Sequence, residues 1–438
     1  MEKFIFLAFV DVLLASLLMF QPIICSSNFT NQEALLHFKS TMEVDPTNTI
    51  KGGNWTVEAN FCEWIGVVCS SRRQRVTALD LSHMGLQGRL SPYLGNLSLL
   101  ASLDLRNNSF YGMILMEIGH LRHLKKLILE LNYQCQNLEV LSLATNWLMG
   151  GIPREFGTFL KLQQLNLSSN DLWGQIPSFL GNISTLQVIT LANASLTGLI
   201  LSALFNRSLT WVNLNDNYLS GSLPFDLCYR WPNIQMLSVH QNQFSGLLPE
   251  TLTQCKELII LWLSYNRFQG SIPRDIGSLH KLQKLYIDVN NLTGTIPQTI
   301  GNMSSLQKLQ IAANNIEGEI PSEIGKLVNL QQMALAENLL TGEMPQEVFN
   351  ISSLQELQLM INSLSGSLPS GRDLSLLNLK GLHLFSNGFS GNIPQYFSNF
   401  SNLIIFYVEN NQLSGPIHRG LGNLKNLEVL DIALDQLT

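Results

Sequence analysis

The sequence is poor in charged residues. Only 13% of its 438 residues are Asp, Glu, Lys or Arg, and the formal net charge is −6. A surface that binds nucleic acid needs a concentration of Lys and Arg on one face. The composition therefore argues against a nucleic-acid partner.

The sequence also lacks the motifs of common enzyme classes. It contains no Gly-rich loop followed by a Val-Ala-x-Lys strand, no His-Arg-Asp, no Asp-Phe-Gly and no Gly-x-Ser-x-Gly. The eight histidines show no metal-ligand spacing, and the carboxylates are scattered rather than paired. We therefore predict that this chain is not an enzyme and has no catalytic residue, no metal site and no small-molecule cofactor.

Long apolar runs are absent except at the N-terminus. There, Lys3 precedes the mostly apolar run 4–20, and small residues follow at 25–27. This arrangement is typical of a secretory signal peptide, which we place at residues 1–27. Asp11 interrupts the run, and a retained membrane anchor is the alternative, although the run is short for a bilayer span. Because no other run approaches spanning length, we expect a chain in the secretory pathway.

A secreted chain can carry N-linked sugars, which keep the surfaces around them out of tight contacts. Twelve Asn-x-Ser/Thr sequons occur, and we expect sugar on many of them. The predicted glycosylation sites are Asn28, Asn54, Asn96, Asn107, Asn166, Asn182, Asn193, Asn206, Asn291, Asn302, Asn350 and Asn399.

The cysteines point to an oxidising compartment. Cys62 and Cys69 lie close together in the sequence, and we predict a disulfide between them. We interpret Cys135, Cys228 and Cys255 as buried thiols. A Cys228–Cys255 bridge between adjacent repeats is the alternative, which their different offsets within the repeat disfavour.

From Val76 onward the sequence repeats with a period of about 24 residues. Each repeat opens with L-x-x-L-x-L-x-x-N, as in 282–290, and continues with x-L-x-G-x-I-P. The alternation of Leu285 and Ile287 with exposed positions predicts a short strand. We expect the strands of successive repeats to form one parallel sheet, with a short helical or irregular segment returning the chain each time.

The Asn of each repeat is predicted to point inward and to bond the backbones of neighbouring coils, because an unpaired buried amide is costly. The turn that follows is represented by Gly294, which permits the turn dihedrals, and Pro297, which fixes φ. This asparagine ladder comprises Asn108, Asn132, Asn146, Asn170, Asn217, Asn242, Asn266, Asn290, Asn314, Asn338, Asn362, Asn387 and Asn411, and it lapses at Met84, Ala194 and Asp435.

Two repeats depart from this template. The coil at 124–137 has only 14 residues and lacks the second half of the motif, so we predict a local kink or disorder near Tyr133. The last coil, 427–438, stops at Thr438 without a closing cap. We therefore expect the solenoid, 76–438, to be a fragment or a truncated product.

Residues 28–75 precede the repeats, and we predict that they cap the first hydrophobic cross-section of the stack. The spacing at 30–33 matches a capping box, which marks the start of a helix. Leu35, Phe38 and Met42 then supply the apolar face of that helix.

The repeat at 162–181 resembles the plant extracellular leucine-rich repeat, and Cys62-x-Trp64-x-Gly66-Val67-x-Cys69 resembles the N-terminal module of that family. The stretch 76–100 is similar to the first coils of the receptor-kinase subfamily that holds the elongation-factor-Tu receptor and the rice bacterial-blight resistance receptor. The resemblance implies an α/β repeat fold: a right-handed leucine-rich-repeat solenoid with a parallel concave β-sheet and an N-terminal helical, disulfide-bonded cap. Members of that subfamily continue into one membrane helix and a Ser/Thr kinase, whose motifs are not in this sequence.

Without catalytic motifs, function is expected at the exposed positions of the concave sheet. Aromatic side chains there are enriched in binding hot spots; the alternative is that some of them only stack on cross-strand neighbours. The candidate ligand-binding residues are Trp211, His240, Trp262, Tyr286, Asp288, His383, Phe385, Tyr407 and Glu409.

The resemblance implies the ligand-sensing extracellular region of a plant receptor-like kinase or receptor-like protein. Such a region binds a peptide or protein epitope on its concave face for immune or developmental signalling, with a co-receptor kinase ectodomain as a further partner. It would lie outside the plasma membrane in a longer form, or in the apoplast otherwise. The alternative is a soluble leucine-rich-repeat inhibitor of a pathogen cell-wall hydrolase, which the number of coils disfavours because such inhibitors are similar but shorter.

Overall fold

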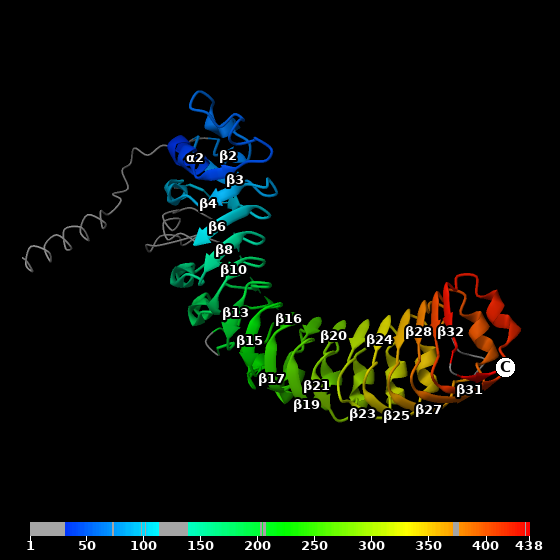
Figure 1. Ribbon diagram of the computed structural model, residues 1–438. Helices are drawn as coiled ribbons and strands as arrows, with labels where there is room; N and C mark the ends of the chain where they lie inside the picture. The colour runs from blue at the N-terminus through cyan, green and yellow to red at the C-terminus, as the bar shows by residue number, and fades with distance from the viewer. Residues whose placement is uncertain are drawn as a thin grey trace, which may run out of the picture.

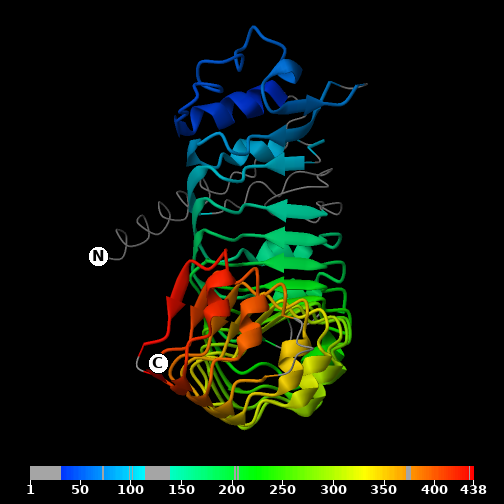
Figure 2. The same cartoon turned by 90° about the vertical axis from the view of Figure 1, so that its right-hand side faces the viewer.

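The computed structural model describes residues 31–438, apart from 72–73, 98, 101, 114–138, 202–203, 205–206, 371–375 and 434. The described chain forms one curved stack of coils, with the N-terminal segment at one end and the C-terminal coils at the other (Figure 1). Viewed from the side, successive coils lie one beneath another below the N-terminal segment (Figure 2). The predicted leucine-rich-repeat solenoid with a parallel sheet and a disulfide-bonded cap is confirmed.

The first half of each coil contributes a strand to a parallel sheet that lines the inner, concave side of the curve (Figure 1). In β20, Leu285 is buried between half-buried Lys284 and Tyr286, as the alternation predicted. Within the described residues, thirteen strands pair in one continuous order: β7 (Val140–Ser142), β9 (Gln164–Asn166), β12 (Val188–Thr190), β14 (Trp211–Asn213), β16 (Met236–Ser238), β18 (Ile260–Trp262), β20 (Lys284–Tyr286), β22 (Lys308–Gln310), β24 (Gln332–Ala334), β26 (Glu356–Gln358), β28 (Gly381–His383), β30 (Ile405–Tyr407) and β32 (Val429–Asp431). Nearer the N-terminus, β3 (Val76–Asp80) and β5 (Ser102–Asp104) pair in the same way.

A second series of short strands follows the ladder asparagines on the outer side of the curve (Figure 1). The sequence analysis predicted a single sheet and missed this series. After Asn290, Asn291 and Thr293 are exposed while Leu292 between them is buried, which is the alternation of a strand. The members of this series are β4 (Gln87–Arg89), β6 (Ser109–Met113), β8 (Trp147–Gly150), β10 (Asp171–Leu172), β11 (Gly174–Gln175), β13 (Leu196–Gly198), β15 (Tyr218–Gly221), β17 (Gln243–Leu247), β19 (Arg267–Ser271), β21 (Asn291–Thr293), β23 (Glu317–Gly318), β25 (Leu339–Glu343), β27 (Ser363–Ser367), β29 (Gly388–Gly391), β31 (Gln412–Gly415) and β33 (Gln436–Leu437).

Short 3-10 helices then return the chain to the next strand. Gly294 has a φ of 73°, a left-handed conformation that glycine adopts without steric cost. Pro297 follows at the N-cap of the next helix with a φ of −65°, as its ring requires. These helices are η2 (Pro92–Asn96), η4 (Arg154–Thr158), η5 (Ser178–Asn182), η7 (Glu250–Gln254), η8 (Ile276–Ser278), η9 (Gln298–Asn302), η10 (Ser322–Lys326), η11 (Gln346–Asn350), η12 (Gln395–Asn399) and η13 (Arg419–Asn423), and the N-terminal segment holds one more, η1 (Phe61–Glu63).

The asparagine ladder connects successive coils. The Nδ2 of Asn290 donates to the backbone oxygen of Leu263 in the preceding coil (3.1 Å) and to that of Ile287 in its own coil (3.2 Å). Its Oδ1 accepts from the backbone nitrogen of Phe268 (3.0 Å). The same pattern occurs at the other ladder asparagines that the structure describes. The predicted inward orientation is therefore confirmed.

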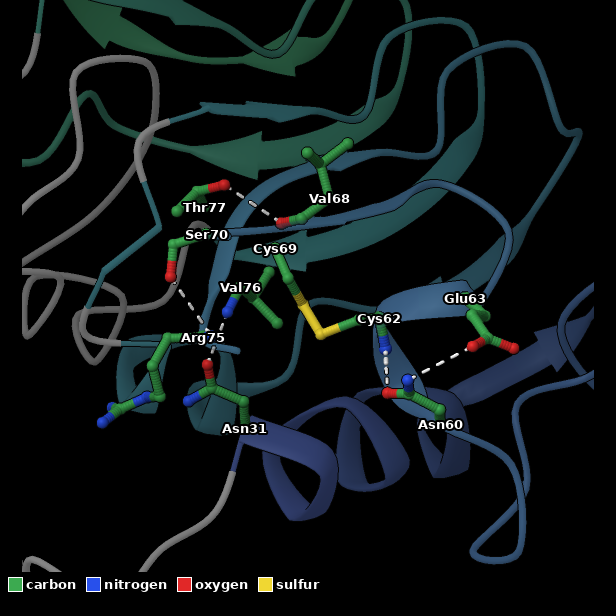
Figure 3. Close-up of a disulfide and its surroundings, with 10 residues drawn as sticks. All are labelled: Asn31, Asn60, Cys62, Glu63, Val68, Cys69, Ser70, Arg75, Val76 and Thr77. Carbon is green, nitrogen blue, oxygen red and sulfur yellow. Dashed lines mark hydrogen bonds between the residues drawn. A yellow bond between two sulfur atoms is a disulfide. The ribbon is translucent and has the colours of Figure 1, made fainter. Parts of the chain in front are cut away.

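The N-terminal segment covers the first coil through helix α2 (Asn31–Ser40). This helix buries Phe38, and the Oδ1 of Asn31 accepts a hydrogen bond from the backbone nitrogen of Val76 (2.7 Å, Figure 3). The predicted Cys62–Cys69 disulfide is present beside this contact (Figure 3). The cap is thus joined directly to the first residue of the repeats.

Two strands of the cap close the edges of both sheets. β2 (Val67–Cys69) pairs antiparallel with β3 on the concave side, and β1 (Met42–Val44) pairs antiparallel with β4 on the outer side. Because an uncovered strand edge can pair with other chains, these two cap strands protect the N-terminal edges of both sheets. Met42, which we expected on the apolar face of the helix, is buried in β1 instead, because α2 ends at Ser40.

A second disulfide joins Cys228 to Cys255, which corrects the interpretation of these residues as thiols. Their separation of 27 residues exceeds the 24-residue period by three, or about one helical turn. In this coil the return segment is the helix α3 (Leu227–Arg230). The Cα atoms of the two cysteines lie 4.9 Å apart, so the different offsets do not separate them.

Several predictions lie outside the described residues, namely the signal peptide at 1–27, the kink near Tyr133, Cys135, and the sequons Asn28 and Asn206. The last coil, 427–438, contributes β32 and β33, and its Leu430 is 41% exposed. Within the part of the chain that the structure describes, no helix has the length and apolarity needed to cross a membrane.

Replacing Asn290 by Ala removes one rung of the ladder. The buried backbone N–H of Phe268 then loses its acceptor, so we expect Asn290→Ala to lower the free energy of unfolding by about 2 kcal/mol. Urea denaturation monitored by tryptophan fluorescence measures this change. Asn315→Ala is the matched control, since Asn315 is exposed. Equal urea midpoints for the two variants would contradict the role assigned to the ladder.

The second disulfide should stabilise the fold by restricting the unfolded chain. For a loop of this size, the chain-entropy model predicts that Cys228→Ser combined with Cys255→Ser costs about 3.5 kcal/mol. Thermal unfolding measures the loss, and peptide mapping without reduction tests the bond itself. Free-thiol labelling of both cysteines in the folded wild-type protein would show that the bond does not form.

Candidate ligand-binding face

The candidate residues lie on neighbouring strands of the concave sheet. In every strand from β7 to β30 the middle residue is buried, and the third residue lies on the opposite, concave face. This third position is in register from coil to coil, so it forms a row across the sheet. The row contains Asn213, Ser238, Trp262, Tyr286, Gln310, Ala334, Gln358, His383, Tyr407 and Asp431.

Four aromatic side chains meet at one part of this row and form the N-proximal cluster: His240, Trp262, Tyr265 and Tyr286. The ring centroid of Trp262 lies 4.5 Å from that of His240 and 5.4 Å from that of Tyr286. Tyr265 contacts His240 edge-on at 5.2 Å. Trp262 therefore contacts His240 and Tyr286, as the stacking alternative expected, and all four side chains remain at least partly exposed on the face. That they bind a ligand stays a prediction.

Asp288 lies beside the N-proximal cluster and is largely desolvated. The Oγ of Ser264 donates to its Oδ1 at 2.5 Å. Burial nevertheless raises the pKa of Asp288, and this effect outweighs the hydrogen bond and the proximity of His240. Burial also lowers the pKa of His240, against the attraction of Asp216 and Asp288. The scaffold therefore holds Asp288 in a place that disfavours its charge.

A second group, the C-proximal cluster, consists of His383, Phe385 and Tyr407. The ring centroid of Tyr407 lies 5.4 Å from that of His383 and 6.3 Å from that of Phe385. The Nε2 of His383 is 3.7 Å from the Oε2 of Glu356. Burial lowers the pKa of His383 and raises that of Glu356, so burial disfavours the charged form of both partners.

Glu409 follows β30 at the edge of the C-proximal cluster. Burial raises its pKa, and repulsion from Asp431 and Asp435 raises it further. Its Oε2 is buried without a hydrogen-bond partner. This end of the concave face therefore concentrates negative charge that the protein itself does not neutralise.

A strip of small side chains separates the two clusters. Ala334 and Ala336 are buried in the coil of β24, and Ala312 lies in the coil before it. Because these residues project little from the sheet, the face is lower here than at Tyr286 or His383. A ligand that contacts both clusters would cross this strip.

Trp211 contacts neither cluster, whereas Asp288 and Glu409 each border one. Trp211 is 38% exposed and occupies the first position of β14, where its cross-strand partners are Val188 and Met236. The sequence analysis missed Tyr265, which lies in the turn after β18 with a left-handed φ of 56°. It also missed Glu356, which occupies the first position of β26.

The sequons divide the concave face into two parts. Asn166 is the third residue of β9 and lies in the row itself, two strands before Asn213. Asn107 and Asn193 occupy the left-handed turns just before their ladder positions. In the coils from β14 onward, the described sequons lie on other sides: Asn291 begins β21, and Asn302, Asn350 and Asn399 end η9, η11 and η12. The face from Trp211 to Glu409 therefore has no sequon on its strands.

The titratable groups of the face are distributed along its length. They are partly buried and are not paired around one point. Among the described residues, no group of three or more His, Cys, Asp or Glu side chains could hold a metal ion.

Comparison with protein families finds only repeats and their cap. The description "Leucine rich repeat" matches residues 232–292 and 280–340, and also 161–183, 208–229 and 378–400. The description "Leucine rich repeat N-terminal domain" matches residues 31–70. These matches agree with the coils and the cap seen in the structure.

Curated relatives are plant receptor kinases. A segment of 99 residues, 23% of this chain, is 41% identical to the LRR receptor-like serine/threonine-protein kinase EFR of Arabidopsis thaliana and covers 10% of it. A segment of 79 residues, 17% of this chain, is 42% identical to the receptor kinase-like protein Xa21 of Oryza sativa subsp. japonica and covers 8% of it. The matched segments thus span a tenth or less of these relatives.

Several solved structures with the same fold are plant receptors. The crystal structure of a TDR receptor is 30% identical with a TM-score of 0.76, and the match covers 82% of this chain and 64% of that one. The plant peptide hormone receptor RGFR1 in complex with RGF2 is 29% identical with a TM-score of 0.58, covering 82% and 70%. The Arabidopsis receptor kinase HAESA, in complex with the peptide hormone IDA and the co-receptor SERK1, is 25% identical with a TM-score of 0.51, covering 93% and 94%.

The raised pKa of Asp288 has a measurable consequence for stability. Between its unfolded pKa and its higher folded pKa, the folded state binds more protons, so stability falls as pH rises through this window. Asp288→Asn removes the charge while its amide oxygen can still accept from Ser264. We therefore expect a higher urea midpoint than wild type at pH 7, and a difference that shrinks below about pH 4.

Urea denaturation across this pH range tests the prediction. Asp275→Asn is the matched control, because Asp275 is exposed beside η8 and lies away from the concave face. A variant Asp288→Asn that is less stable than wild type at pH 7 would show that the carboxylate supports the fold.

Proposed function

We propose that this chain, which belongs to the ectodomain family of plant leucine-rich-repeat receptor-like kinases, is a ligand-sensing extracellular domain that binds a peptide along its concave sheet. The observation that carries the proposal is the presence of two aromatic clusters on one face, separated by a strip of alanines. Aromatic side chains anchor ligands because they offer large, rigid contact areas. The two clusters supply two anchor points in one line.

The distance between the clusters suits an extended peptide. Four strand spacings separate β20 from β28, which amounts to about 19 Å at about 4.8 Å per strand. An extended chain rises about 3.3 Å per residue, so about six residues bridge the two clusters. A ligand of about ten residues would then contact both of them.

The sequon pattern supports the same location. Sugar on Asn166 would occupy the concave face ahead of the clusters, while sugars on Asn291, Asn302, Asn350 and Asn399 would leave the clusters open. We infer that ligand binding is confined to the coils from β14 onward. The Asn-x-Ser/Thr sites and the two disulfides fit a chain that functions outside the cell.

The relatives suggest how binding is used. Two of the solved relatives are a plant peptide hormone receptor in complex with RGF2, and a receptor kinase in complex with the peptide hormone IDA and the co-receptor SERK1. We infer that this chain likewise acts at the outer face of the plasma membrane in immune or developmental signalling, with a co-receptor ectodomain as a second protein partner.

A synthetic library of random decapeptides tests the proposal. The purified secreted chain should retain a subset of the library, detected by mass spectrometry of the bound fraction. Trp262→Ala, Tyr286→Ala and Tyr407→Ala should each weaken binding of the retained peptides by about tenfold or more, since buried aromatic anchors contribute roughly 2 kcal/mol or more.

Trp173→Ala and Tyr229→Ala are the matched controls, because both residues are exposed outside the concave sheet, at 63% and 81%. These variants should bind the retained peptides as wild type does. If all five variants bound equally well, peptide recognition would not use the concave face.

A further inference from the structure

Two lysines lie side by side on the concave face. Lys284 of β20 and Lys308 of β22 are direct cross-strand partners in the parallel sheet, and both are half-buried. Like charges directly opposite one another in a sheet are destabilising. The pair therefore concentrates positive charge at one point, and the fold gains no stability from it.

Neither ammonium group is neutralised by the protein. Among the residues that the structure describes, the ion pairs join Arg106 to Asp104, Arg230 to Asp226, Lys281 to Glu257 and His383 to Glu356, and neither Lys284 nor Lys308 takes part. Lys281 offers a contrast, because it reaches Glu257 on the neighbouring coil at 2.6 Å. The lysine pair is thus available to an anion from outside.

The surroundings of the pair suit a ligand group. On the same two strands, Tyr286 and Gln310 are cross-strand partners on the same face. The ring of Trp262 packs against Tyr286 with centroids 5.4 Å apart. A group held by the lysines would therefore lie beside the ring of Tyr286 on one strand and the side-chain amide of Gln310 on the next.

The face changes sign toward the C-terminus. Glu356 occupies the position equivalent to Lys308, two strands further along the sheet, and its charge is partly offset by the nearby Lys380. Glu409 and Asp431 follow in the coils of β30 and β32. Repulsion from Asp431 helps to raise the pKa of Glu409. The lysine pair attracts an anionic group of a ligand, and the acidic residues near the C-terminus repel it. The charge pattern of the concave face therefore favours binding of such a group at the lysine pair.

Building on the proposed peptide-binding function, we propose that Lys284 and Lys308 together bind a carboxylate of the peptide ligand. The carboxylate belongs either to an Asp or Glu side chain or to the C-terminus of the peptide. Each ammonium donates a charge-assisted hydrogen bond to it. Three strand spacings, about 14 Å, separate β22 from β28, so the carboxylate lies about four extended residues from the group that contacts the C-proximal cluster.

The decapeptide library measures this preference when it is made in two forms, one with free C-terminal carboxylates and one with C-terminal amides. Wild type should retain peptides with Asp or Glu enriched at one position if the carboxylate comes from a side chain. It should retain peptides of the free-carboxylate form preferentially if the carboxylate is terminal.

Charge reversal is the decisive variant. In the double variant Lys284→Glu and Lys308→Glu, the preference for a carboxylate should disappear and a preference for Lys or Arg should replace it. A carboxylate peptide retained by wild type should bind this variant about 10- to 100-fold more weakly. Adding salt should weaken its binding to wild type.

The matched control is the double variant Lys326→Glu and Lys425→Glu, which makes the same charge change at exposed positions of the return segments. It should keep the wild-type preference and affinity. Both double variants should unfold at the temperature of wild type, which shows that any change arises in binding.

The outcomes separate the two proposals. If the charge-reversed variant retains peptides with an unchanged preference, the lysine pair does not read a carboxylate, and peptide binding by the concave face still stands. If wild type retains no decapeptide at all, the proposed function fails, and this inference fails with it.

Discussion

The hydrogen bonds of the asparagine ladder are the constraint on which the rest of this structure depends. Each strand ends in a buried turn whose backbone groups cannot reach water, and such groups must find partners. An asparagine side chain has both the donors and the acceptor for this task. Consecutive rungs share a carbonyl: the backbone oxygen of Leu263 accepts from Asn266 and from Asn290, both at 3.1 Å. At the lapse Asp435, the carboxylate has no N–H to donate, and its Oδ2 is left buried without a partner.

The backbone just before each ladder position is equally constrained. The residue before each rung takes a left-handed conformation whatever its type, including Val289 with a φ of 51° and Ile361 with a φ of 55°. Branched side chains rarely adopt such angles. His83 and Asn193 take the same conformation before the lapses Met84 and Ala194, so the turn of the coil, and not the asparagine alone, outweighs the local preference. Positions on the concave strands are then free to vary, because the ladder and the buried leucines already specify the scaffold.

The concave face carries charged residues at positions where the scaffold does not require them. Asp288 and Glu409 sit where burial raises their pKa, and Lys284 faces Lys308 across the sheet. None of these arrangements favours folding. Natural sequences depart from stabilising choices mainly where function demands it. These charged residues do not stabilise the fold, and they lie beside the aromatic clusters and away from the sequons. They therefore indicate the part of the molecule where a ligand is expected.

The sequence by itself determined the repeat period, the inward asparagines, the Cys62–Cys69 bridge and the row that holds Trp262 and Tyr286, because each follows from short-range spacing. Tertiary structure alone decided which side chains meet between coils: the contact of Tyr265 with His240, the Cys228–Cys255 bridge and the pairing of the outer strands. Residues about 24 positions apart touch only when the return segments between them have the right length and turn, and these segments tolerate many sequences. The structure of one coil follows from its local sequence pattern. The alignment of two neighbouring coils depends on the entire return segment that connects them.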